Sequence, residues 1–154
     1  MNQPFASFKV FSTVFLRLAF GTAFLSAVAD RFGLWGSFGQ PNVAWGDYAR
    51  FVAYTGKLNW FAPVATIPAL AAISTAAELL FGIMLILGYH TRIAALFSGA
   101  LLLIFAATMT LALGVKAPLN FSVFSAAAGA FLLATSEDFP ISLDAAISNS
   151  RSTS

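Results

Sequence analysis

The segment Ser74–Arg92, STAAELLFGIMLILGYHTR, is a long apolar run with a single carboxylate, Glu78, inside it. A helix that crosses a bilayer needs about 20 mostly apolar residues. A charged side chain in the hydrocarbon layer costs about 3 kcal/mol on insertion scales, so such a residue normally faces the interior of a bundle and has a partner. The segment therefore predicts a membrane helix whose Glu78 points toward other helices.

The composition of the whole chain extends this prediction. Of its 154 residues, 59% are hydrophobic and 9% are charged, whereas soluble domains carry charge at about 25% of positions. We predict an all-α fold: an integral membrane four-helix bundle formed by residues 1–135, followed by a polar tail, 136–154, that is mobile beyond Ile147. The apolar runs place the spans at about 11–29, 66–87, 93–113 and 121–135.

The only long connection, residues 31–63, contains all three tryptophans. Tryptophan and tyrosine rings prefer the headgroup layer. Asn42 is the predicted N-cap of a short helix that runs to about Thr55 and stops at Gly56. We interpret this helix as interfacial and as covering one mouth of the bundle; an ordinary connecting loop is the alternative.

Several classes of function are excluded or weakened by residue counts. The basic residues are scattered and the net charge is +2, so no basic patch for nucleic acid exists. The absence of cysteine excludes thiol chemistry and iron–sulfur clusters held by this chain. One histidine in a turn is weak support for a metal, so we expect no metal site and no covalently bound cofactor.

A second charge, Arg17, lies within the first apolar run. It follows Lys9 by eight residues, and Glu78 precedes Leu87 by nine, so both lie about 12 to 14 Å from the same end of the bundle. We therefore predict an Arg17–Glu78 ion pair. It either fixes helix register only or forms the polar floor of a ligand or proton site; alternatively, Arg17 reaches the interface and leaves Glu78 unpaired or protonated.

Other polar and small residues suggest contacts at the ends of the bundle. Asp30 is predicted to pair with Arg50, Lys57 or Lys116 and so attach the loop, and Arg92 to anchor on lipid phosphates. The loop residues expected at the mouth are Asp30, Trp35, Trp45, Tyr48 and Arg50. Small residues repeat at helical spacing, which favours close packing within the bundle or, as the second reading, a homodimer interface; they are Ala65, Ala69, Ala72 and Ala76, and Ser122, Ala126 and Ala130.

Two stretches, Arg17–Gly33 and Ala77–Ala95, resemble the DoxX family of small four-helix membrane proteins. The likeness is carried by the arginine and glycine of the first helix and by a glutamate followed by Gly-x-x-Leu-x-x-Gly and an arginine. The matching positions are Arg17, Gly21, Glu78, Gly82, Gly88 and Arg92. The resemblance implies a membrane bundle that in some members is a subunit of a thiosulfate:quinone oxidoreductase and in others a partner of redox or stress proteins.

Three functions remain open from the sequence. The first is a membrane subunit of a redox system that binds a quinone or another small lipophilic molecule between its helices. The second is a non-catalytic anchor or scaffold for a soluble redox or stress-response protein, and the third is a small transporter or proton pathway. Enzyme activity would need a quinone or a partner with its own cofactor. We expect a bacterial-type inner (cytoplasmic) membrane with both termini in the cytoplasm.

Overall fold

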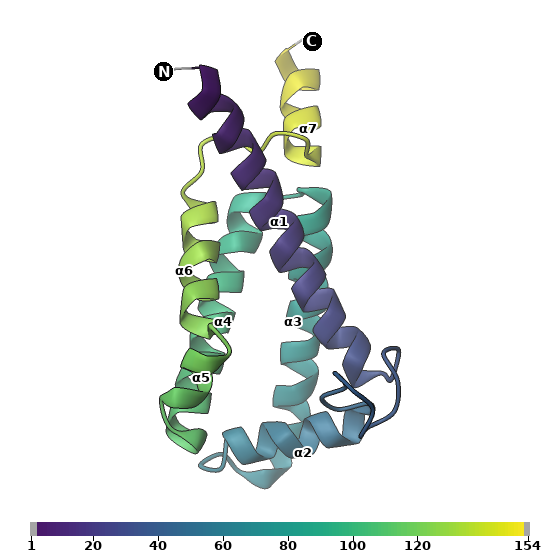
Figure 1. Cartoon of the computed structure of the whole chain (residues 1–154). Helices are drawn as coiled ribbons and strands as arrows, with labels where there is room; N and C mark the ends of the chain where they lie inside the picture. The colour runs from purple at the N-terminus through teal and green to yellow at the C-terminus, as the bar shows by residue number, and fades with distance from the viewer. Residues whose placement is uncertain (1–2, 153–154) are drawn as a thin grey trace.

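A computed structural model describes residues 3–152 and has the predicted all-α fold (Figure 1). Within these residues no strand occurs. The elements are α1 (Gln3–Arg31), α2 (Tyr48–Leu58), the 3-10 turn η1 (Val64–Thr66), α3 (Ile67–Leu87), α4 (Thr91–Leu113), α5 (Lys116–Asn120), α6 (Val123–Ala134) and α7 (Leu143–Ser152).

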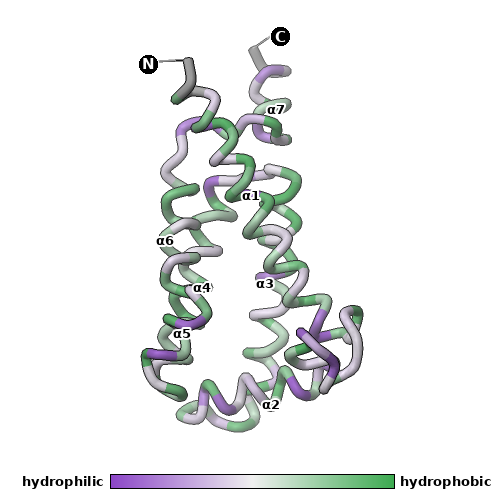
Figure 2. Tube along the Cα trace, in the orientation of Figure 1, coloured by the Kyte–Doolittle hydropathy of each residue, from purple (hydrophilic) through white to green (hydrophobic). Residues whose placement is uncertain are grey.

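The protein is an integral membrane protein. Three stretches are long and apolar enough to cross a bilayer: Ser7–Arg31, Val64–Leu87 and Thr91–Leu113. Only 22 to 28% of the residues in these apolar windows are buried inside the protein, so most of their apolar side chains lie at least partly on the outside of the bundle. The fourth member of the bundle, α6, is shorter, with 12 residues. Figure 2 shows apolar residues along the four bundle helices and polar residues gathered in the loop and at the ends.

The bundle is built from two close helix pairs, α1 with α3 and α4 with α6 (Figure 1). Where α1 crosses α3, a Cβ added to Gly21 would lie 2.9 Å from the carbonyl oxygen of Gly82. Where α4 meets α6, the ring of Phe131 fills the space beside Gly99. Glycine at these positions therefore allows the helices to approach closely.

The helix α2 lies across one end of the bundle, opposite the ends of the described chain (Figure 1). Its N-cap is Asp47, whose Oδ1 accepts a hydrogen bond from the backbone N–H of Arg50 at 2.8 Å. The prediction that Asn42 caps this helix and Gly56 ends it was wrong. Asp47 supplies the capping carboxylate directly before the first residue of α2. Gly56 lies inside α2, next to Ile67 of α3, and its backbone is not left-handed.

Two further findings differ from the predictions for packing and for the tail. The alanines at 65, 69, 72 and 76 are exposed, so they do not pack within this chain, whereas Ala130 of α6 is fully buried. The tail contains α7, and its backbone is attached to the bundle because the N–H of Asp144 donates to the carbonyl of Gly88 at 2.9 Å. The mobility predicted beyond Ile147 stays a prediction.

Candidate functional site

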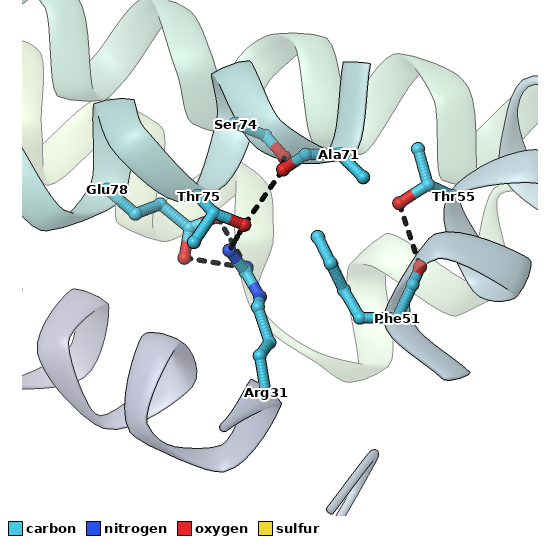
Figure 3. Close-up of polar contacts among 7 residues, drawn as sticks. All are labelled: Arg31, Phe51, Thr55, Ala71, Ser74, Thr75 and Glu78. Carbon is cyan, nitrogen blue, oxygen red and sulfur yellow. Dashed lines mark hydrogen bonds and ion pairs between the residues drawn. The ribbon is translucent and has the colours of Figure 1, made fainter. Parts of the chain in front are cut away.

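Glu78, on α3, is paired with Arg31, the last residue of α1. The Nη2 of Arg31 donates to both carboxylate oxygens of Glu78, at 2.6 and 2.8 Å (Figure 3). Its Nη1 donates to Thr75 Oγ1 at 2.9 Å, one turn earlier on α3. Both charged side chains are 2 to 3% exposed. The carboxylate inside the apolar helix is thus neutralised by a buried, charge-assisted contact.

Aromatic rings cover this ion pair from the side of α2. The guanidinium carbon of Arg31 lies 3.7 Å from the centroid of the Phe51 ring and 5.5 Å from that of Trp45. Phe51 is on the buried face of α2, and its ring meets Trp45 edge-on at 5.2 Å. Because a cation is attracted to the face of an aromatic ring, Arg31 joins α1, α3 and α2 at one point.

The predicted Arg17–Glu78 pair does not form. The depth estimate placed Lys9 and Leu87 at the same level, but Arg17 lies beside the last turn of α3: its Nε donates to the Leu85 carbonyl at 3.1 Å and its Nη2 to that of Ile86 at 3.2 Å. Since α1 begins at Gln3, it extends about 21 Å beyond this level, and Lys9 lies about 12 Å beyond it. Because α1 is shifted along α3 in this way, Arg31 at the other end of α1 lies within reach of Glu78.

Arg17 also holds the tail. Its Nη1 donates to the carbonyls of Pro140 at 2.9 Å and Ile141 at 3.0 Å. Its guanidinium passes over Gly88, where any Cβ would collide with it. Gly88 has a φ of 67° and ends α3 in the left-handed conformation that glycine tolerates best. The side chain of Arg17 is only 2% exposed. The carbonyls of Leu85 and Ile86 that it contacts lie at the C-terminal end of α3, which is the negative end of the helix dipole.

Asp144 completes this attachment. Its Oδ1 accepts the backbone N–H of His90 and its Oδ2 that of Thr91, both at 2.8 Å. Partial burial opposes ionisation of Asp144, but the hydrogen bonds from Thr91 and His90 outweigh it and lower the pKa of the carboxyl. Asp144 therefore caps the N-terminus of α4 from the tail.

Asp30 attaches the long loop, but not through a basic side chain. Its Oδ2 accepts the backbone N–H groups of Ala44 at 3.0 Å and Trp45 at 3.1 Å. The predicted partner Arg50 instead pairs with Asp47 at 2.9 Å. The Oδ1 of Asp30 is buried and has no hydrogen-bond partner among the described residues.

The other predicted mouth residues stabilise the loop locally. The indole N–H of Trp35 donates to the Ser26 carbonyl and hydroxyl, both at 3.1 Å. Tyr48 stacks on Phe32 with ring centroids 5.6 Å apart. The guanidinium of Arg50 lies 4.0 Å from the centroid of Phe38, and the hydrogen bond from its backbone N–H is the main reason that the pKa of Asp47 is lowered.

Arg92, the last of the matching positions, donates from Nη2 to the carbonyl of Ser136 at 2.9 Å and is exposed. It therefore links the start of α4 to the chain that follows α6. Whether it also contacts lipid phosphate stays a prediction.

These networks also contain three residues for which the sequence predicted no such contact: Arg31, Thr75 and Asp144. For Arg31 one signal was present, because it ends the first helix and directly precedes the aromatic loop whose rings cover it. For Asp144 there was no local signal, because its partners lie 53 and 54 residues earlier in the chain.

The arrangement limits what chemistry the site can perform. Arg31 and Glu78 are closed to solvent and mutually satisfied, apart from Arg31 Nε, which has no partner in the described part of the chain. No group of three or more potential metal-ligating side chains occurs within the described residues. A cavity of about 380 Å³, in the form of an open groove, lies between α2 and the start of α3, with nearly apolar walls that include Val52, Gly56, Trp60 and Ile67.

A comparison with protein-family models matches residues 12–112 to the family described as DoxX. The match includes α1 from its third turn onward, the loop, α2, α3 and nearly all of α4. Comparisons with curated proteins and with solved structures gave no match.

Proposed function

Because the chain belongs to the DoxX family and is an integral membrane protein, we propose that it is a membrane subunit of a redox system that binds a quinone or another small lipophilic molecule. The observation that carries this proposal is the cavity between α2 and α3. Its volume, about 380 Å³, falls within the range of about 300 to 1,000 Å³ of small-molecule sites.

The walls of this cavity suit a lipophilic ligand. Val52 and Ile67 provide an apolar surface, and Asn59 and Trp60 provide the side-chain groups that can hydrogen-bond a carbonyl. Because α2 lies across an end of the bundle, a molecule dissolved in the bilayer can reach the cavity at the level of the interface. The Arg31–Glu78 pair then holds the wall of the site in place rather than contacting the ligand.

A photoreactive quinone analogue tests this proposal in protein reconstituted into lipid. Labelling is expected on α2 and the first turn of α3, and an excess of unmodified quinone should prevent it. Ala53→Leu, inside the cavity, should reduce labelling, whereas Ala49→Leu, on the same helix outside it, should not. Labelling spread over all lipid-facing helices, or equal in both variants, would reject the cavity as the site.

The anchor or scaffold function is the second candidate. It is favoured by the closed Arg31–Glu78 contact, in which two buried charges are paired with each other rather than with a ligand. A soluble redox or stress-response protein would then bind at an end of the bundle. Cross-linking from single positions on α7 and on the loop would capture the same protein repeatedly if this function holds.

We propose that the exposed alanines of α3, Ala69, Ala72 and Ala76, form the interface of a homodimer. Small residues allow two helices to approach closely in lipid. Ala72→Phe should reduce the fraction of dimer in detergent. Leu70→Phe, at an exposed position on another face of α3, is the matched control.

We also propose the bacterial-type inner (cytoplasmic) membrane, with the ends of the chain in the cytoplasm. Since the sequence has no cysteine, single cysteines at Ser148 and Ala49 report the two sides directly. A membrane-impermeant thiol reagent added outside the inner membrane should label Ala49→Cys and not Ser148→Cys; the reverse pattern would invert the orientation.

A further inference from the structure

A second cavity, an open surface groove of about 420 Å³, lies between α1 and the end of α6 at the same end of the bundle as the tail. Its lining changes from charged to apolar along the helices. Lys9 and Glu137 are charged, Ser12 and Ser136 carry hydroxyls, and Leu16 and Leu132 are apolar. A polar mouth above an apolar floor matches the two ends of a lipid molecule.

The level of this cavity in the membrane follows from the helices around it. Leu16 packs against a core cluster that includes Ala94, close to the start of α4. The 23 residues of α4 extend about 34 Å, slightly more than the hydrocarbon layer of about 30 Å, so its start lies near the edge of that layer. Lys9, seven residues before Leu16, is about 10 Å further out, at the level of the headgroups.

The two charges at the mouth are available to a ligand. Lys9 Nζ lies 3.6 Å from Glu137 Oε2, and the two side chains are 44 and 85% exposed. Exposed pairs of this kind contribute only about 0 to 1 kcal/mol, so other charged groups readily compete for them. A purely anionic headgroup would be repelled by Glu137, whereas a headgroup with a phosphate and an ammonium satisfies both residues.

We propose that this cavity binds a zwitterionic phospholipid with a primary ammonium headgroup. The phosphate pairs with Lys9, the ammonium donates hydrogen bonds to Glu137, and the first part of an acyl chain lies along Leu16 and Leu132. Phosphatidylethanolamine has this chemistry. Phosphatidylcholine lacks the N–H donors, and phosphatidylglycerol lacks the positive charge.

Native mass spectrometry of the full chain in detergent, with equal amounts of the three lipids added, tests the proposal. The unmodified protein should retain phosphatidylethanolamine in preference to both others. Glu137→Gln should lower its retention relative to phosphatidylglycerol by about threefold, as expected for the loss of one exposed charge contact. Lys9→Gln should lower retention of both, because each lipid contributes a phosphate.

The control is an exposed ion pair at the opposite end of the bundle, Asp47 with Arg50. Asp47→Asn and Arg50→Gln should leave lipid retention unchanged. Because Lys9 and Glu137 are exposed, their variants should keep the unfolding temperature of the parent protein, which separates a binding effect from misfolding. Equal retention of the three lipids by the unmodified protein, or unchanged retention in both Lys9→Gln and Glu137→Gln, would overturn the proposal.

Discussion

Asp144 accepts a hydrogen bond from the backbone N–H of Thr91 at 2.8 Å, so a residue of the tail caps a helix that begins 53 residues earlier. The N-cap position of α4 itself is His90, whose side chain forms no capping hydrogen bond. The tail therefore supplies a contact that the local sequence of α4 lacks, and this relationship predicts how stability depends on pH.

Replacing Asp144 by Ala should destabilise the protein by about 1 kcal/mol, the usual contribution of an N-cap. The pKa of Asp144 is lowered in the folded protein, so its ionised form contributes stability above the ordinary carboxyl pKa of about 3.9. That contribution is lost as the pH falls through the lowered pKa. Unfolding temperatures between pH 7 and pH 3 should therefore decline more steeply in the parent protein than in Asp144→Asn; parallel curves would contradict this assignment.

Breaking the Arg31–Glu78 pair should be more costly. Glu78→Gln leaves a buried guanidinium without its counter-charge, and a loss of about 3 to 5 kcal/mol is expected. The double variant Arg31→Met with Glu78→Leu removes both charges and should recover most of that loss, because Met still packs against Phe51. A double-mutant cycle of thermal stability in detergent, built from Arg31→Met, Glu78→Leu and their combination, measures this coupling; additive single effects would show that the pair is not coupled.

Gly21→Ala should separate α1 from α3. The added methyl group would lie 2.9 Å from the Gly82 carbonyl oxygen, with Ile86 also in the way, and overpacking of this kind costs about 1 to 3 kcal/mol. Gly56→Ala is the matched control, because its nearest neighbour is at an ordinary 3.4 Å. The control should be neutral or slightly stabilising, since alanine is a better helix former than glycine. Equal unfolding temperatures for the two variants would refute the close crossing.

Arg17→Lys should loosen the tail while the bundle stays folded. Lysine keeps the charge but cannot donate to four carbonyls on two segments, as Arg17 does for Leu85, Ile86, Pro140 and Ile141. Hydrogen exchange should accelerate in residues 140–147 more than in α4. Unchanged exchange in the tail would mean that Asp144 alone holds it.

The sequence predicted the membrane fold and a buried partner for Glu78, but it could not identify that partner. Apolar runs and the need to neutralise Glu78 follow from local composition and from the cost of charge in hydrocarbon. The choice between Arg17 and Arg31 depends on how far α1 is shifted along α3, and this shift is set by the close crossing at Gly21 and Gly82. The estimate from the sequence assumed that Lys9 and Leu87 lie at the same level in the membrane, and it therefore contained no information on that shift.

For the loop as well, composition predicted the location but not the individual contacts. Aromatic content predicted that residues 31–63 lie at the bundle end, and α2 lies there. Asp30 was predicted to pair with Arg50, Lys57 or Lys116, but its partners are the backbone N–H groups of Ala44 and Trp45. Side-chain counting cannot find such partners, because every residue other than proline carries the same donor.

The attachment of the tail also has a consequence for biosynthesis. A ribosome adds about 5 to 20 residues per second, so the 53 residues between Thr91 and Asp144 take about 3 to 10 s to make. During that interval α1 and α3 are already present and α4 is being made. Arg17 and the first turn of α4 still lack the tail carbonyls and the carboxylate that later satisfy them. The nascent protein must therefore pass through a stage in which the insertion machinery, lipid headgroups or water satisfy these groups. That stage ends when the tail with α7 has been made and reaches the bundle.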